Sequence, residues 1–112
     1  MGVTNIRTPE VDQLLQAILS FDNTDDLFGF MVDLCTIREL NEMSQRFEVA
    51  RLLAAGEPYA VVHEATGASS TTVARVSKAL NHGEGGYMLS LAKMAPKRDP
   101  KTITKGALKK NQ

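Results

Sequence analysis

The chain has 112 residues, 43% of them apolar, and its 13 Lys and Arg balance 13 Asp and Glu. This length accommodates one domain and excludes two of ordinary size. The sequence has no apolar run of about 18 residues and no charged-then-apolar start, which excludes a membrane span and a signal peptide and predicts a cytoplasmic protein.

The charge is distributed unevenly along the chain. Residues 1–67 hold four Arg and eleven Asp or Glu, whereas residues 68–112 hold nine Lys or Arg and two acidic residues. The basic half fits a polyanionic partner, although charged stretches are more often ordinary solvated surface. Cys35 is the only cysteine, which excludes an internal disulfide, and its mostly apolar neighbours predict that it is buried.

Two helices are predicted in the first part of the acidic half. Thr8 can cap the first, which has Pro9 at its first position and continues to about Ser20. Thr24 can cap the second, whose apolar positions recur with a helical period as far as Cys35.

The longest predicted helix follows. Thr36 and Glu39 have the spacing of a capping box at its start, and Gly56 supplies its end. The acidic helices are rich in Leu, Phe and Met, and each is too small to bury its apolar stripe within so short a chain. Pairing with a second copy is therefore expected, and a monomeric bundle is the alternative.

A helix-turn-helix is predicted over about residues 58–82. The first helix, Pro58 to Thr66, ends at Gly67, which permits a sharp turn, and Ser69 or Ser70 caps a second helix from about Thr71 to His82. The first helix is expected to brace the second through three apolar side chains, those of Val61, Val62 and Ala65.

The second helix has two contrasting faces. Val73, Val76 and Leu80 lie on one face and are expected to dock onto the domain. The opposite face carries small side chains at its leading end and cations behind them, namely Thr71, Ala74, Arg75, Lys78 and His82. A helix that enters the major groove of DNA needs this arrangement, because bulk or negative charge at its leading end would keep it from the bases.

The remaining sequence contains a Gly-rich loop and one more short helix, "YMLSLAKMA", before Pro96. No strand-like alternation of apolar residues occurs, so the chain is predicted to be all-α, with a helical domain over residues 1–95. Residues 96–112 form a basic tail that is predicted to be disordered; it is either simply solvated or touches DNA phosphates.

The sequence does not favour an enzyme or a metalloprotein. His63 and His82 are far apart and have no cysteine or carboxylate cluster at metal-ligand spacing. No Ser-His-acid set or pair of carboxylates stands out, so we expect no catalytic residue, no metal and no cofactor.

The segment "LCTIRELNEMSQRFEVARLLAAGEPYAVVHEATGASSTTVARVSKALNHG" resembles the Trp repressor-like superfamily, and the chain as far as "GGYMLSL" is similar to its small YerC/YecD family. The shared features are Thr36, Arg46, Gly56 with Glu57, Gly67 and Arg75. The resemblance implies a Trp repressor-like helical bundle that forms an intertwined homodimer, whose two reading heads meet successive major-groove faces.

The resemblance also implies site residues. The positions that match the DNA-reading residues of the family are Ser70, Thr71 and Ala74, with Thr72 near a phosphate. The helical arrangement itself adds Arg75 and Lys78 to this DNA-binding set.

The effector site of the family consists of two arginines and a threonine, which match Arg46, Arg75 and Thr36. Val76 stands where the repressor has a small glycine, and its isopropyl group would project into the space that an indole needs. Tryptophan is therefore a doubtful effector. Ordinary surface pairing is the alternative for both arginines: Arg75 with an acid, and Arg46 with Glu42 one helical turn away.

The sequence thus predicts a transcriptional regulator, most simply a repressor, that binds a palindromic site on double-stranded DNA as a homodimer and is gated by a small-molecule effector. The alternative is a non-enzymatic interaction module in which the helix-turn-helix is a relic and the acidic half docks a partner.

Overall fold

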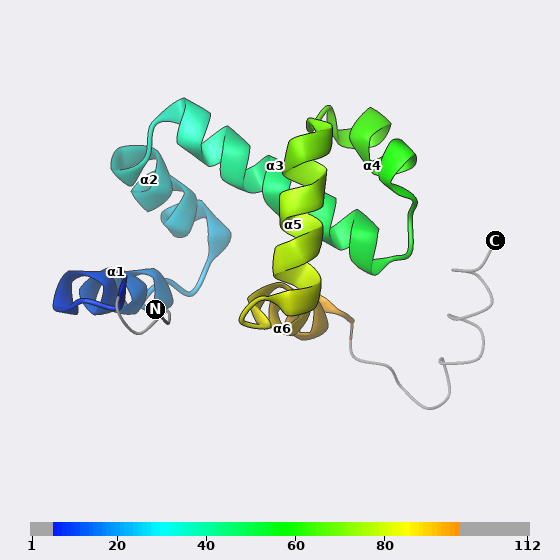
Figure 1. Ribbon diagram of the computed structural model, residues 1–112. Helices are drawn as coiled ribbons and strands as arrows, with labels where there is room; N and C mark the ends of the chain where they lie inside the picture. Colours follow the sequence, from blue (N-terminus) through cyan, green and yellow to red (C-terminus); the bar gives the residue numbers. More distant parts are fainter. Residues whose placement is uncertain (1–5, 97–112) are drawn as a thin grey trace. The chain divides into compact units, whose positions relative to one another are not determined.

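The computed structural model describes residues 6–96, and every regular element in that range is an α-helix (Figure 1). The predicted all-α fold is confirmed. None of these helices is both long and apolar enough to cross a membrane. The chain divides into two compact units, Met1–Ser44 and Gln45–Gln112, which are described in turn. Residues 97–112, where the tail was predicted to be disordered, lie outside the described residues.

The first unit begins with two helices of equal length. In α1 (Pro9–Leu19), Thr8 is the predicted cap, and its side chain accepts a hydrogen bond from the Val11 backbone N–H at 3.2 Å. The cap of α2 (Thr24–Leu34) is Asn23, whose side-chain oxygen accepts from the Asp26 N–H at 2.8 Å. The prediction that Thr24 caps this helix is wrong by one residue, because Asn and Thr are both good caps and stand side by side.

The long helix α3 (Ile37–Ala54) begins in the first unit and ends in the second. Its capping box is confirmed: Thr36 Oγ1 accepts from the Glu39 N–H at 3.0 Å, and Glu39 Oε1 accepts from the Thr36 N–H at 2.8 Å. The helix ends where Gly56 adopts φ +92°, a left-handed conformation that favours glycine.

The first unit has no buried residue in α1 or α2. Leu19 is 82% exposed and Phe28 is 62% exposed, while the rings of Phe21 and Phe30 pair at a centroid distance of 5.2 Å. Cys35 is only half-buried, so the prediction that it is buried is wrong. The reason is that α1 and α2 leave large apolar side chains in solvent and contribute no buried residue around it.

The second unit consists of the end of α3 with α4 (Tyr59–Thr66), α5 (Ser70–His82) and α6 (Gly86–Met94). In Figure 1, α5 crosses the C-terminal half of α3, and α4 and α6 pack against α5. The core of this unit contains only small apolar residues, which let the helices approach closely: Val49, Ala50, Val62, Ala68, Val73 and Val76.

Fewer side chains of α4 than predicted are buried between the two helices of the helix-turn-helix. Val62 is fully buried, but Val61 is 45% exposed and Ala65 is also exposed. The expectation that all three brace α5 is therefore wrong for Val61 and Ala65. An eight-residue helix turns one narrow side to its neighbour, and successive side chains are about 100° apart around the helix axis.

Candidate nucleic-acid interface

The turn between α4 and α5 is fixed by glycine and by side-chain hydrogen bonds. Gly67 adopts φ +72°, and its N–H donates to the His63 carbonyl at 2.9 Å. Thr66 Oγ1 accepts from the Ala68 N–H at 3.1 Å, and the His63 ring hydrogen-bonds to the Ala68 carbonyl through Nδ1. Ala68 is itself buried at 1% exposure. The turn therefore sets the direction in which α5 leaves it.

Ser69 caps α5, as one of the two predicted alternatives. Its side-chain oxygen accepts from the Thr72 N–H at 3.1 Å and its hydroxyl donates to Thr72 Oγ1 at 3.1 Å. The first turn of α5 holds no acidic residue. The first turn therefore places no negative side chain of its own at the positive end of the helix dipole.

The structure brings the predicted DNA-contacting side chains together on one face of α5. Val73 and Val76 are buried on the opposite face, at 1% and 2% exposure, and Leu80 is half-buried. The prediction that this face docks onto the domain is confirmed. Of the six proposed contact residues, Thr72 is half-buried and the others are exposed: Ser70, Thr71, Ala74, Arg75 and Lys78.

The two cations of this face differ from most of the arginines that the structure describes. Among residues 6–96, ion pairs join Arg7 to Asp12 at 2.8 Å, Arg38 to Glu42 at 3.3 Å and Arg51 to Glu48 at 2.7 Å. Hydrogen bonding to Glu48 raises the pKa of the Arg51 guanidinium, and the same contact lowers the pKa of Glu48.

By contrast, Arg75 and Lys78 contact no acidic side chain within the part of the chain that the structure describes. The alternative in which Arg75 pairs with an acidic residue is therefore wrong for the acidic residues among residues 6–96. Both cations remain available to an anionic partner.

Residues 6–96 form six helices, and α5 among them is free of acidic residues and has one exposed face. The profile of the Trp repressor protein family matches residues 9–95. The chain belongs to the Trp repressor family. It is 41% identical over 91 residues to the uncharacterized protein YerC of Bacillus subtilis strain 168, a match that covers 81% of this chain and 88% of YerC.

Two solved structures support the same assignment. One is a candidate Trp repressor from Staphylococcus aureus, with a TM-score of 0.81 and 33% identity over 88% of this chain and 99% of that one. The other is a TrpR-like protein from Eubacterium eligens, with a TM-score of 0.75 and 42% identity over 84% of this chain and 99% of that one. Membership of the Trp repressor family indicates a DNA-binding helix-turn-helix regulator and not an enzyme.

The three residues that match the effector site of the Trp repressor family are not shown assembled. Thr36 belongs to the first unit, whereas Arg46 and Arg75 belong to the second. Thr36 also has a structural role, because it exchanges hydrogen bonds with Glu39 at the start of α3. The N–H of Thr36 is the main cause of a lowered pKa at Glu39.

Arg46 is exposed on α3 and contacts no acidic side chain among residues 6–96. The expected pair with Glu42 is wrong, because Glu42 Oε2 instead accepts from Arg38 Nε at 3.3 Å. Arg38 and Arg46 both lie four residues from Glu42, and this carboxylate binds the former. No ion pair among residues 6–96 therefore accounts for Arg46.

Val76, the residue after Arg75 in α5, is buried. Its side chain is 2% exposed and packs within the core of the second unit. The isopropyl group is thus part of the packing that holds α5 in place.

Sequence reasoning missed two features of the second unit. His63, which was considered only as a metal ligand, hydrogen-bonds across the turn. The sequence analysis also did not predict the cavity between the end of α3 and α5. The one local signal of it is the pair Ser77 and Asn81, which are four residues apart on α5 and both line the cavity. Asn81 Nδ2 donates to the Ser77 carbonyl at 2.9 Å.

Proposed function

We propose that this chain is a sequence-specific transcriptional regulator that acts in the cytoplasm, binds a palindromic operator as a homodimer and, most simply, represses. The observation that carries the proposal is the exposed face of α5, which has no acidic residue in its first turn and presents two cations that contact no acidic side chain among the described residues. Such a face suits the major groove, where small side chains reach base edges and cations meet phosphates.

The homodimer is supported by the first unit. Its helices leave apolar side chains in solvent that a monomer would bury only poorly, among them Leu14, Leu15, Leu19, Phe28, Val32 and Leu34. Exposed apolar area on this scale is typical of a protein interface. In a symmetric dimer, two copies of α5 would read half-sites about 34 Å apart, which is one turn of DNA.

The direct test is selection of genomic fragments by the purified protein at near-physiological salt. We expect a few enriched sites that share an inverted repeat. Unenriched DNA, together with salt-resistant capture of one protein through the acidic half, would contradict the proposal and favour the interaction module with a relic helix-turn-helix.

Substitution of Arg75 distinguishes contact with a base from general contact with phosphates. If Arg75 reads a base, Arg75→Ala should weaken operator binding by about 1–3 kcal/mol and relax specificity at one position. Arg38→Ala is the matched control. Arg38 is exposed, but it lies on α3 and not on α5, and it is paired with Glu42 of the same helix. An equal loss on every sequence would make Arg75 a phosphate contact instead.

Effector gating through Thr36, Arg46 and Arg75 is the finer part of the proposal. Two exposed arginines with no acidic partner among residues 6–96 suit a ligand that carries a carboxylate. Calorimetry with a panel of amino acids tests it. Heat that disappears in Arg46→Ala supports gating at these residues, and flat traces for every amino acid would remove it.

A further inference from the structure

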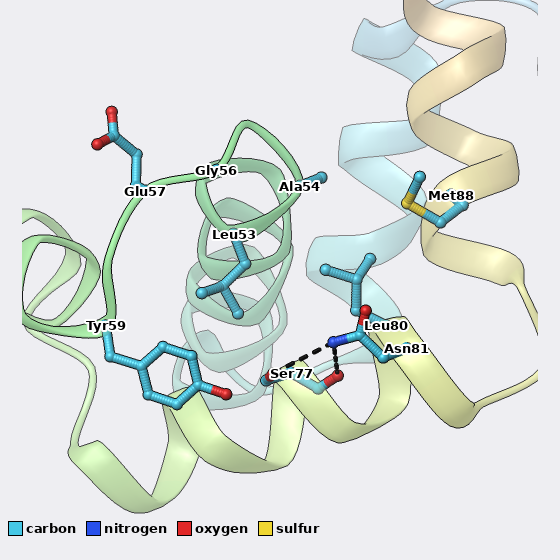
Figure 2. Close-up of a pocket in the computed structure, with 9 residues that line it drawn as sticks. All are labelled: Leu53, Ala54, Gly56, Glu57, Tyr59, Ser77, Leu80, Asn81 and Met88. Atoms are coloured by element: carbon cyan, nitrogen blue, oxygen red, sulfur yellow. Dashed lines mark hydrogen bonds between the residues drawn. The ribbon is translucent and has the colours of Figure 1, made fainter.

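The second unit contains a cavity of about 400 Å³ between the end of α3, the turn before α4, the C-terminal half of α5 and the start of α6 (Figure 2). This volume lies within the range of about 300–1,000 Å³ that is usual for small-molecule sites. Its lining includes Leu53, Glu57, Tyr59, Ser77, Leu80, Asn81 and Met88.

The cavity lies outside the buried core of this unit. The buried cluster of this unit is made of Val and Ala alone, and the larger Leu53 and Leu80 are half-buried at the cavity wall. Leu53 and Leu80 are not members of that buried cluster. A ligand could therefore enter without displacing the core.

The polar groups of the cavity present mainly acceptors. Asn81 Nδ2 donates to the Ser77 carbonyl at 2.9 Å and to Ser77 Oγ at 3.3 Å, as the dashed lines in Figure 2 show. Because both bonds use the amide nitrogen, Asn81 Oδ1 is left as an acceptor. Tyr59 adds a hydroxyl and the face of an aromatic ring.

The charge of the lining selects between ligand classes. Among residues 6–96, no Lys, Arg or His lines the cavity, and the single charged residue is Glu57, whose carboxylate points away from Leu53 at the rim in Figure 2. An anionic ligand would find no cation there and would meet the field of Glu57. A cationic ligand would be attracted by Glu57 and by the face of Tyr59.

We propose that this cavity is a binding site for a small amine with an apolar body. The body would contact Leu53, Leu80 and Met88, and the ammonium group would donate to Asn81 Oδ1, on the side of the cavity opposite Glu57 in Figure 2. This site shares no residue with the Thr36, Arg46 and Arg75 set, and it takes a ligand of opposite charge. Its effect on DNA would come from bracing α5 against α3, a consequence that rests on the proposed function.

The test is an NMR titration of the full chain without DNA, with phenethylamine as the probe and 3-phenylpropionate as the matched anion. We expect saturable amide shifts from phenethylamine that cluster at Gly56, Tyr59, Ser77 and Asn81. The anion should give none at equal concentration. Shifts of equal size from both probes, shifts away from the cavity, or none at all would overturn the proposal.

Two variants localise the site. Asn81→Leu removes the acceptor at nearly constant size and should weaken phenethylamine binding by about tenfold, whereas Asn41→Leu, on the exposed surface of α3, should leave it unchanged. Glu57→Gln, at an exposed position, should weaken binding by a few fold and reduce its dependence on salt. Unchanged affinity in both cavity variants would exclude this site.

The binding test and the DNA test fail independently. Loss of operator selection would leave the amine titration valid, and loss of amine binding would leave the operator valid. Where both succeed, fluorescence anisotropy of labelled operator with and without phenethylamine measures the bracing. Equal operator affinity with and without phenethylamine would show that the amine binds in the cavity without changing DNA binding.

Discussion

Ser69 Oγ accepts the backbone N–H of Thr72 and donates to Thr72 Oγ1, and both bonds are 3.1 Å long. The hydrogen of the Thr72 hydroxyl is left to donate elsewhere, because the Thr72 oxygen is the acceptor in this pair. The side chain that caps α5 thus also orients a side chain proposed to lie near a phosphate. Helix stability and DNA contact are linked through these two residues.

Ser69→Ala should lower the free energy of unfolding by about 1 kcal/mol, since it removes the cap of α5. Operator affinity should fall as well, because the Thr72 hydroxyl loses its orientation. Ser44→Ala is the control: Ser44 lies within α3, donates only to the Leu40 carbonyl and caps nothing. Chemical denaturation of the three proteins measures the effect, and equal stability of all three would show that the cap is unimportant.

Gly67→Ala should destabilise the protein by about 1 kcal/mol. Nothing lies within 4 Å of a Cβ added there, so the whole effect arises from the left-handed backbone at φ +72°. Gly29→Ala is the matched comparison: it is also free of contacts but lies in α2 without a positive φ, and it should stabilise by about 0.5–1 kcal/mol. Thermal unfolding of both variants checks the opposite signs.

Val62→Ala should cost about 2 kcal/mol, because a fully buried side chain loses two methyl groups and leaves a void in the core. The neighbouring Val61→Ala should change stability by less than about 0.5 kcal/mol, since Val61 is 45% exposed. Urea unfolding separates the two. Similar losses at both positions would mean that Val61 is buried in solution, as it would be in an interface.

Lys78→Ala should weaken binding to all DNA sequences by a similar factor and reduce the slope of log affinity against log salt by about 1. Lys93→Ala, an exposed lysine in the last turn of α6, should leave the slope unchanged. A sequence-dependent effect of Lys78→Ala would instead make this residue a base contact.

Acid should remove the stabilisation that Glu39 provides. Its pKa is lowered in the folded protein by hydrogen bonds from Thr36, first of all from the backbone N–H. A lowered folded pKa gives stability that is present above the unfolded pKa, about 4.3, and is lost as the pH falls through the folded value.

Glu39→Gln cannot ionise, so the stability difference between wild type and this variant should shrink as the pH falls from 7 to about 3. Thr36→Val retains the backbone bond and should show a smaller change in pH dependence than Glu39→Gln. Urea unfolding at several pH values measures the differences. A constant difference across this range would show that the carboxylate does not titrate with folding.

The helix boundaries were largely predictable because local chemistry sets them. Thr8, Thr36 and Gly67 act through hydrogen bonds or backbone conformations that involve only neighbouring residues. The cap of α2 was missed by one residue because Asn23 and Thr24 are both suitable, and only the folded backbone distinguishes them.

The features that could not be predicted from the sequence depend on which of several equivalent or distant residues come into contact. Glu42 has an arginine four residues away on each side, and spacing alone does not say that Arg38 takes it. The half-buried state of Cys35 depends on whether helices close over it, which no local pattern decides. The cavity requires the ends of several elements to meet, as at Leu53 and Asn81.

On the proposed function, α5 separates the side chains that hold the domain together from those that read DNA. Val73 and Val76 are buried, whereas Ser70, Thr71 and Ala74 make none of the core contacts. Substitutions at the reading positions therefore carry little penalty in folding. A lineage of such proteins can drift toward new operators one base at a time while its scaffold is conserved, so that relatives with the same fold would come to control different genes.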